Sequence, residues 1–297
     1  MPLRREKLPG THIVGRGAEH LLAVCGLLHL GCLSVAPPKD AQGSWGAPSE
    51  GALLGGTALP NQGAGYVRAR PDEPTRFGTE RMVNALERAA RIVAEHFEGT
   101  FPLKIGDLSS QEGGAHPRHG SHRSGRDADI IYYITDVKGH PHRGMGWLAF
   151  NRFGFAREQG GPQGKQGSGK TFFFDEARNW HLVRTLLSDP SIDVQWIFCS
   201  YGIKARLLSY AAIHEPDAGI LFRAAWILHR PTNARSHSDH FHVRIMCSIE
   251  EHASGCLDTA PVWPWLRHRD DLRNWQADPV FGDQELISEL MRDTSQR

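Results

Sequence analysis

Two stretches of sequence decide how this chain folds. They are His119-Gly-Ser-His122-Arg-Ser-Gly-Arg-Asp127-Ala-Asp129 and His237-Ser-Asp-His240-Phe-His242-Val-Arg-Ile245. The first leads into a strand-like run over residues 128–134, and the second runs into another over residues 240–247. Because side chains alternate between the two faces of a strand, His240 and His242 are expected on one face, about 7 Å apart. Phe241, Val243 and Ile245 then point the other way, into the core.

The side chains in these two clusters are the kinds that bind zinc. Neutral imidazole and carboxylate are preferred ligands of Zn²⁺ at hydrolytic sites, where three protein ligands leave one position for water. The turn permitted by Gly125 can fold His122 back beside Asp129, at the start of its strand. Asp127 shares a strand face with Asp129 and could orient a ligand without binding the metal itself. A lone His-x-His pair is weak support for a metal, but two clusters that each adjoin a strand favour one.

The remaining pattern predicts an α+β fold. Helical spacing covers residues 80–97 after a capping Thr79 and residues 175–187 after a capping Asp175, with a further helical piece over 203–212. Strands are expected over 102–105 and 194–199, and a long glycine-rich loop over 138–170. This order predicts a small antiparallel sheet, or a mixed one, with flanking helices, long loops and a zinc site on the sheet face.

Composition excludes several classes of protein. The 297 residues carry 34 Lys and Arg against 33 Asp and Glu, for a net charge of +1, so binding to nucleic acid by bulk charge is not expected. A hydrophobic fraction of 40% excludes wholesale disorder. No apolar run reaches the roughly 18–20 residues that a membrane-spanning helix needs.

The N-terminal part of the chain divides into two segments. Residues 1–36 read as a signal peptide or signal-like segment, because basic residues precede the apolar run of 21–28; a buried helix is the alternative. Cys32 ends a lipoprotein-like Leu-Gly-Cys sequence, whereas Ala36 would suit ordinary cleavage, so lipidation stays open. Residues 37–75 are rich in Gly and Pro and are expected to be linker and surface wrap. The catalytic domain is then expected over 76–260, followed by a C-terminal extension over 261–297.

Several other motifs and residues indicate what the chain does not do. Residues 164–171 match the phosphate-loop spacing, but Thr171-Phe-Phe-Phe follows where a helix should begin, so nucleotide binding is not expected. The sequence contains none of the serine motifs of penicillin-binding enzymes and esterases. Cys247 and Cys256 could close a short disulfide loop in an oxidising compartment, a pairing that the sequence leaves open. Cys199 is expected to be a buried thiol, and His140 and His142 to be loop residues.

The combined motifs resemble the penicillin-insensitive murein endopeptidases, which belong to a wider group of zinc peptidases with lysostaphin-type enzymes, D-alanyl-D-alanine peptidases and hedgehog domains. The shared features are His-x6-Asp and a later His-x-His, with Gly106-Asp107, Gly113-Gly114, Gly125-Arg126-Asp127 and several upstream matches. The resemblance covers about residues 44–260. It implies that His122, Asp129 and His242 bind Zn²⁺, and that His119 lies near the metal as a further candidate ligand. It also implies that His240 is the base or transition-state stabiliser and that His237 supports it.

The resemblance also implies a function. It predicts a zinc endopeptidase that hydrolyses the peptide cross-links of peptidoglycan, at the D-alanyl–meso-diaminopimelyl D,D bond, without inhibition by penicillin. The protein would act in the periplasm or be secreted, with membrane anchoring only if Cys32 is lipidated. The alternative is a catalytically silent zinc-fold module that binds cell wall or protein. Retention of both His240 and His237 favours the enzyme, because a binding module needs neither.

Overall fold

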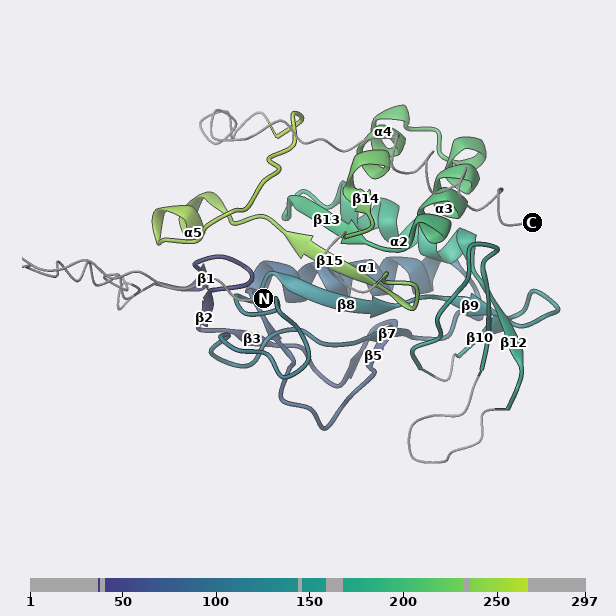
Figure 1. Cartoon of the computed structure of the whole chain (residues 1–297), viewed down its shortest axis with the longest axis horizontal. Coiled ribbons are helices and arrows are strands. Elements are labelled where there is room, and N and C mark those ends of the chain that lie inside the picture. The colour runs from purple at the N-terminus through teal and green to yellow at the C-terminus, as the bar shows by residue number, and fades with distance from the viewer. Residues whose placement is uncertain (1–36, 38–40, 144–145, 159–167, 232–235, 267–297) are drawn as a thin grey trace, which may run out of the picture. The chain divides into compact units, whose positions relative to one another are not determined.

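A seven-stranded sheet organises the fold. The structure is a computed structural model, and it describes residues 37, 41–143, 146–158, 168–231 and 236–266. The strand order is β14-β13-β15-β8-β7-β5-β4, as Figure 1 shows for its central strands. The strands span β4 (Gln62–Gly63), β5 (Tyr66–Arg68), β7 (Leu103–Ile105), β8 (Asp127–Ile131), β13 (Val194–Phe198), β14 (Leu228–His229) and β15 (His240–Ile245).

The main sheet is mixed. Strands β15 and β8 at its centre pair antiparallel, but β13 pairs parallel with β14, and β5 pairs parallel with β7. The expected α+β class is confirmed. Of the two sheet types expected, antiparallel or mixed, the mixed one is present, because long connections bring β5 and β14 to positions parallel to their neighbours.

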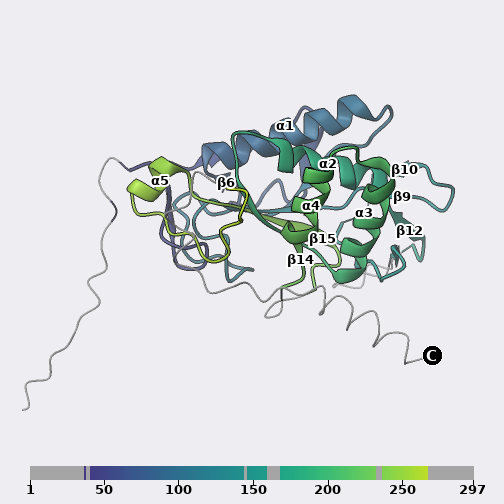
Figure 2. The ribbon, with the colours of Figure 1, turned by 90° about the horizontal axis from the view of Figure 1, so that it is seen from above.

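Helices cover one face of this sheet. They are α1 (Glu80–His96), α2 (Glu176–Ser188), α3 (Tyr201–His214) and α4 (Ala218–Ile227). The short α5 (Ile249–Ala253) packs instead beside strand β1 (Gly43–Trp45). Helix α1 passes behind β8 in Figure 1, and Figure 2 shows α1 and α2 together on that side of the sheet. The caps on Thr79 and Asp175 are as expected, since each side chain accepts a hydrogen bond from the backbone of the first helical turn. Helix α4 was not anticipated.

The core lies between these helices and the inner side chains of β8 and β15. Phe241, Val243 and Ile245 are buried at 1% exposure or less, as alternation along the strand requires. Ala128 and Ile130 of β8 are equally buried beside them. The other face of these two strands is therefore left for polar side chains.

Two segments expected to lack regular structure contain strands. Residues 43–68 include β1 (Gly43–Trp45), β2 (Ala52–Leu54), β3 (Thr57–Ala58), β4 and β5, and Leu53, Leu59 and Tyr66 are buried. The expected glycine-rich loop contains β10 (Pro141–His142) and β11 (Phe155–Arg157), which join β9 (Ile134–Thr135) and β12 (Thr171–Phe174) in a four-stranded sheet. A two-stranded sheet pairs β3 with β6 (Phe77–Gly78). Strands of two to four residues are too short to produce a visible alternation.

The folded part also continues beyond residue 260. Trp263 is 1% exposed, donates a hydrogen bond from Nε1 to the Gln195 carbonyl at 2.8 Å, and packs edge-on against Trp196. Cys247 and Cys256 form a disulfide, and Cys199 is a buried free thiol. Among the described residues, no helix is long and apolar enough to cross a membrane. The expected signal segment, including Cys32, and most of the expected C-terminal extension lie outside the described residues.

Candidate metal centre

Three buried side chains bring potential ligand atoms to one point on the open face of the sheet. The register of β15 against β8 pairs His242 with Asp129, and the loop before β8 adds His122. His122 Nε2 lies 3.3 Å from Asp129 Oδ1 and 3.2 Å from His242 Nδ1, and the remaining side of the triangle, His242 Nδ1 to Asp129 Oδ1, is 3.2 Å. These are three residues that the sequence analysis selected, and the structure brings them together.

A strained turn places His122. Its backbone is in the left-handed region, with φ of 62°, which costs free energy in a residue other than glycine. Its N–H donates to Asp127 Oδ2 at 3.0 Å, which holds the turn closed. Gly125 follows with φ of 76°, and a Cβ there would lie 2.5 Å from Leu53 Cδ1. The turn therefore needs glycine at residue 125, as expected.

Asp127 orients His242. Its Oδ1 accepts a hydrogen bond from His242 Nε2 at 3.0 Å and another from Arg244 Nε at 2.6 Å. With Nε2 protonated, the lone pair of neutral His242 is on Nδ1, which faces the other two ligand atoms. In the metal-free centre, burial would lower the pKa of His242, but the Asp127 and Asp129 carboxylates raise it to about 9.

The Asp129 carboxylate is a buried anion surrounded by histidines. It is fully buried, and neither oxygen has a hydrogen bond of regular geometry. Nitrogens of four imidazoles approach its oxygens within 3.2–3.5 Å. Burial alone would raise its pKa, but His122 and His240 are among the groups that hold it well below the usual range. A buried carboxylate and imidazoles are the donors of a metal site, and His119, His122 and Asp129 are close enough to hold an ion.

His119 lies beside this triangle, between two carboxylates. Its Nε2 is 3.2 Å from Asp107 Oδ2 and 3.3 Å from Asp129 Oδ2. Arg118 also donates to both oxygens of Asp107, and Arg70 donates to Oδ2 at 2.8 Å. With His122 and Asp129, His119 belongs to a group of side chains close enough to hold an ion. His119 is near the centre, as expected, in a position that suits fixing Asp129.

His240 presents a ring nitrogen to the same centre. Its Nδ1 lies 2.6 Å from Asp239 Oδ1, and its Nε2 is buried, 3.5 Å from Asp129 Oδ1 and without a hydrogen-bond partner. Because an ionised Asp239 can only accept, Nδ1 is the nitrogen that donates, and in the neutral ring the lone pair is then on Nε2. The ring of His237 is 5.0 Å from that of His240, and the His237 carbonyl accepts a hydrogen bond from Tyr132 at 2.8 Å.

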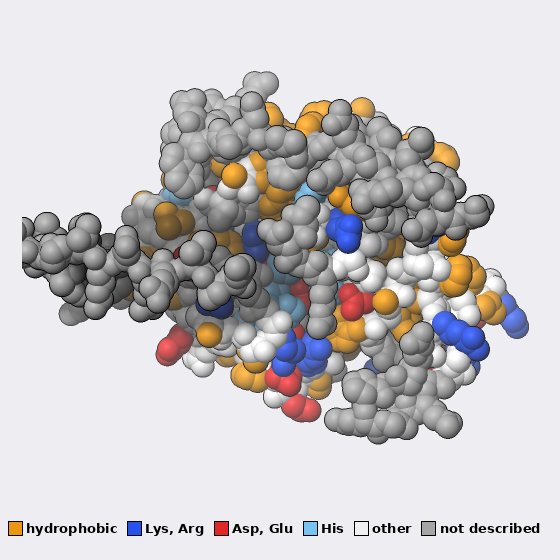
Figure 3. Space-filling model, viewed as in Figure 1, with side chains coloured by type: hydrophobic (Ala, Val, Ile, Leu, Met, Phe, Trp, Pro, Cys, Tyr) orange, Lys and Arg blue, Asp and Glu red, His pale blue; other side chains and the backbone are white. Residues whose placement is uncertain are grey.

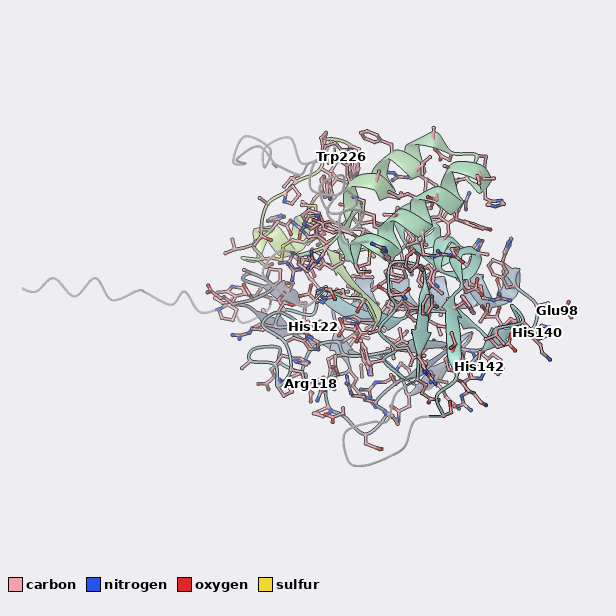
Figure 4. All side chains as sticks on the ribbon, turned by 45° about the vertical axis from the view of Figure 1, so that its right-hand side comes forward. Glu98, Arg118, His122, His140, His142 and Trp226 are labelled. Carbon is pink, nitrogen blue, oxygen red and sulfur yellow. A yellow bond between two sulfur atoms is a disulfide. The ribbon has the colours of Figure 1, made fainter. Side chains whose placement is uncertain are left out.

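The centre opens into a cavity of about 870 Å³. Histidine side chains gather at this place on the face seen in Figure 3, next to acidic and basic ones. Figure 4 shows His140 and His142 far from His122, towards the other end of the molecule. His142 lies in strand β10 and not in a loop, so the expectation of a loop residue is wrong for it. Lys170 and Thr171 lead into strand β12 and not into a helix, so the phosphate-loop motif lacks its required context here.

Four side chains that line this cavity were not singled out from the sequence. Asp107 appeared only within a family motif, and Asp239 only inside the second histidine cluster. Arg118 and Trp147 lie in loops, where no periodic pattern indicates direction. A carboxylate directly before a candidate catalytic histidine is a signal that could have identified Asp239.

Comparisons with known proteins identify the family of this chain. The family model described as penicillin-insensitive murein endopeptidase matches residues 44–289. A protein of that name from Haemophilus influenzae is 29% identical over 256 residues, which cover 83% of this chain and 78% of that protein. Proteins of the same name from Klebsiella pneumoniae and Escherichia coli O1:K1 are 33% and 36% identical, over 32% and 34% of this chain and 34% and 36% of their own lengths. This chain belongs to the penicillin-insensitive murein endopeptidase family.

Proposed function

We propose that this chain is a zinc endopeptidase that cleaves the peptide cross-links of peptidoglycan, with His122, Asp129 and His242 as the zinc ligands. The observation that carries the proposal is the triangle of ligand atoms, whose sides measure 3.2–3.3 Å. Tetrahedral zinc with bonds of about 2.0–2.1 Å requires ligand atoms about 3.3 Å apart. The two histidines and one carboxylate also leave one coordination position open, which is typical of catalytic zinc.

The residues around this triangle support a hydrolytic mechanism. When bound, zinc would polarise the scissile carbonyl and lower the pKa of a coordinated water to about 7. Asp239 holds the Nδ1–H of His240, so His240 Nε2 can take a proton from the attacking water and pass it to the leaving amine. His237 packs against His240 and would keep that ring in place. His119 and Asp107 would fix the free oxygen of Asp129.

The family supports a peptidoglycan substrate and a location in the cell envelope. The name of its members supports cleavage within the peptides of murein, and both that name and a mechanism without a serine nucleophile support insensitivity to penicillin. We propose the D-alanyl–meso-diaminopimelyl D,D bond as the bond cleaved, as the sequence resemblance implies. The Cys247–Cys256 disulfide supports an oxidising compartment, because such bonds persist in the periplasm and outside the cell. We therefore expect a periplasmic or secreted enzyme, with residues 1–36 as its export signal.

The direct test is digestion of purified cross-linked muropeptide dimers, followed by mass spectrometry of the products. The zinc-loaded protein should convert dimers to monomers, 1,10-phenanthroline should stop the reaction, and penicillin should have no effect. His122→Ala should abolish activity and zinc binding, whereas His142→Ala, outside the centre, should retain both. Intact dimers after incubation with fully zinc-loaded protein would favour the silent binding module instead.

A further inference from the structure

A second cavity adjoins the metal centre. Its volume is about 810 Å³, and Arg70 and Trp147 line both this cavity and the one at the metal centre. Its lining includes four basic side chains, and the described lining residues include no Asp or Glu. The basic residues are Arg68, Arg70, Lys104 and Arg143.

A row of paired residues across neighbouring strands connects the metal centre with this cavity. His240 of β15 is paired with Ile131 of β8. The register Ile105↔Ile130 then places Lys104 of β7 beside Ile131, and Lys104 is paired in turn with Val67 of β5. Two strand spacings separate His240 from Lys104, a distance of about 10 Å, which about three extended peptide residues can span.

Trp147 forms the wall between the two cavities. Its ring contacts the ring of His240 edge-on, with centroids 4.9 Å apart, and the Arg70 guanidinium lies 4.8 Å over its centroid. The indole lies directly on Gly106, where a Cβ would come within 2.7 Å of Trp147 Cη2. Arg70 is anchored to Asp107. The wall is therefore fixed from both sides, and the cavity is a preformed extension of the centre.

The charges in this cavity favour an anion. Burial lowers the pKa of Lys104, and the neighbouring Arg143 lowers it further. Arg68 is 95% buried, and it donates hydrogen bonds to neutral oxygens of Asn61, Pro71 and Glu73. Its Nε has no hydrogen-bond partner. A bound carboxylate would relieve the repulsion between the cations and supply charge-assisted hydrogen bonds.

We infer that this cavity is a subsite for a free carboxylate of the cross-linked stem peptides, bound by Lys104 and Arg143 at one side of the scissile bond. The inference rests on the proposed function, because the ligand is part of the same substrate. It assigns substrate selectivity to these two side chains, which lie too far from the metal centre to take part in the chemistry.

The experiment compares the cleavage of two substrates by the wild-type protein and by a set of variants. One muropeptide dimer keeps its free stem-peptide carboxylates, and the other carries them as amides. The wild-type protein should cleave the amidated dimer with a kcat/KM about 10–100-fold lower, mainly through KM, which is the usual effect of one charge-assisted hydrogen bond. Lys104→Gln and Arg143→Gln should raise KM for the free acid and reduce this preference. Lys104→Arg should retain much of the preference for the free acid.

A matched control and a fold check complete the design. Lys138→Gln removes the same charge from an exposed turn and should leave the preference unchanged. The thermal transition of each variant reports whether it is folded. If Lys104→Gln does not fold, Arg143→Gln still tests the subsite, because Arg143 is an exposed side chain. Equal cleavage of both dimers by the wild type would overturn the subsite while leaving the endopeptidase intact. Equal losses on both dimers in the variants would also overturn it. Failure to cleave either dimer would instead refute the proposed function, and the subsite with it.

Discussion

Replacing Asp127 by Asn tests the link between hydrogen bonding and metal affinity. Both Asp127 oxygens accept from N–H groups: Oδ1 from His242 and Arg244, and Oδ2 from the backbone of His122. An asparagine amide fits the same space but replaces one acceptor with a donor. If its NH₂ faces His122, two donors oppose each other. If it faces His242, the imidazole must move its proton to Nδ1, which removes the lone pair proposed to bind the metal.

Either arrangement weakens the centre. An unsatisfied buried hydrogen-bonding group costs about 1–3 kcal/mol, and loss of such a supporting carboxylate reduces metal affinity by about 10–100-fold. Competition with a chromophoric chelator at fixed pH measures zinc affinity directly. Asp72→Asn, which removes the same charge from an exposed loop residue, is the control. Wild-type affinity in Asp127→Asn, to within about twofold, would refute this explanation of how His242 is oriented.

Three further predictions follow from contacts already described. Because the pKa of His242 is raised to about 9 and metal must displace its proton, zinc affinity should rise about tenfold per pH unit between pH 7 and 9; an affinity independent of pH would contradict this. Asp239→Ala should keep zinc but lower kcat by about 10–100-fold, since His240 loses its 2.6 Å partner, and loss of zinc by this variant would instead make Asp239 part of the metal site. Cys247→Ser should destabilise the protein by about 2–4 kcal/mol in denaturant unfolding, and an unchanged midpoint would show that the disulfide contributes nothing.

The parts of the fold predicted from sequence are those with a strong local pattern. Helix α1 has a capping Thr79 and an apolar stripe, and β15 alternates histidine with apolar residues, so both were placed to within a few residues. The same alternation put His240 and His242 on one face. These predictions succeed because the physics that produces them acts between near neighbours in sequence.

The rest depends on contacts between distant residues. Strand β5 is three residues long and exists because Tyr66 is paired with Leu103 of β7, which no local pattern in 37–75 records. Asp239 precedes β15, where alternation does not fix the direction of a side chain. Trp147 reaches His240 from a glycine-rich loop, and only the packed structure shows that it separates two cavities.

The central claim is that one histidine of the His-x-His pair binds the metal while the other moves a proton. Zinc content and muropeptide hydrolysis, measured on the same preparations of His240→Ala and His242→Ala, separate these roles. We expect His240→Ala to retain about one zinc ion per chain and to lose about 10²–10⁴-fold in kcat, which is the usual contribution of general acid–base catalysis. His242→Ala should lose zinc and activity together. A zinc-free His240→Ala beside a zinc-loaded His242→Ala would contradict the assignment.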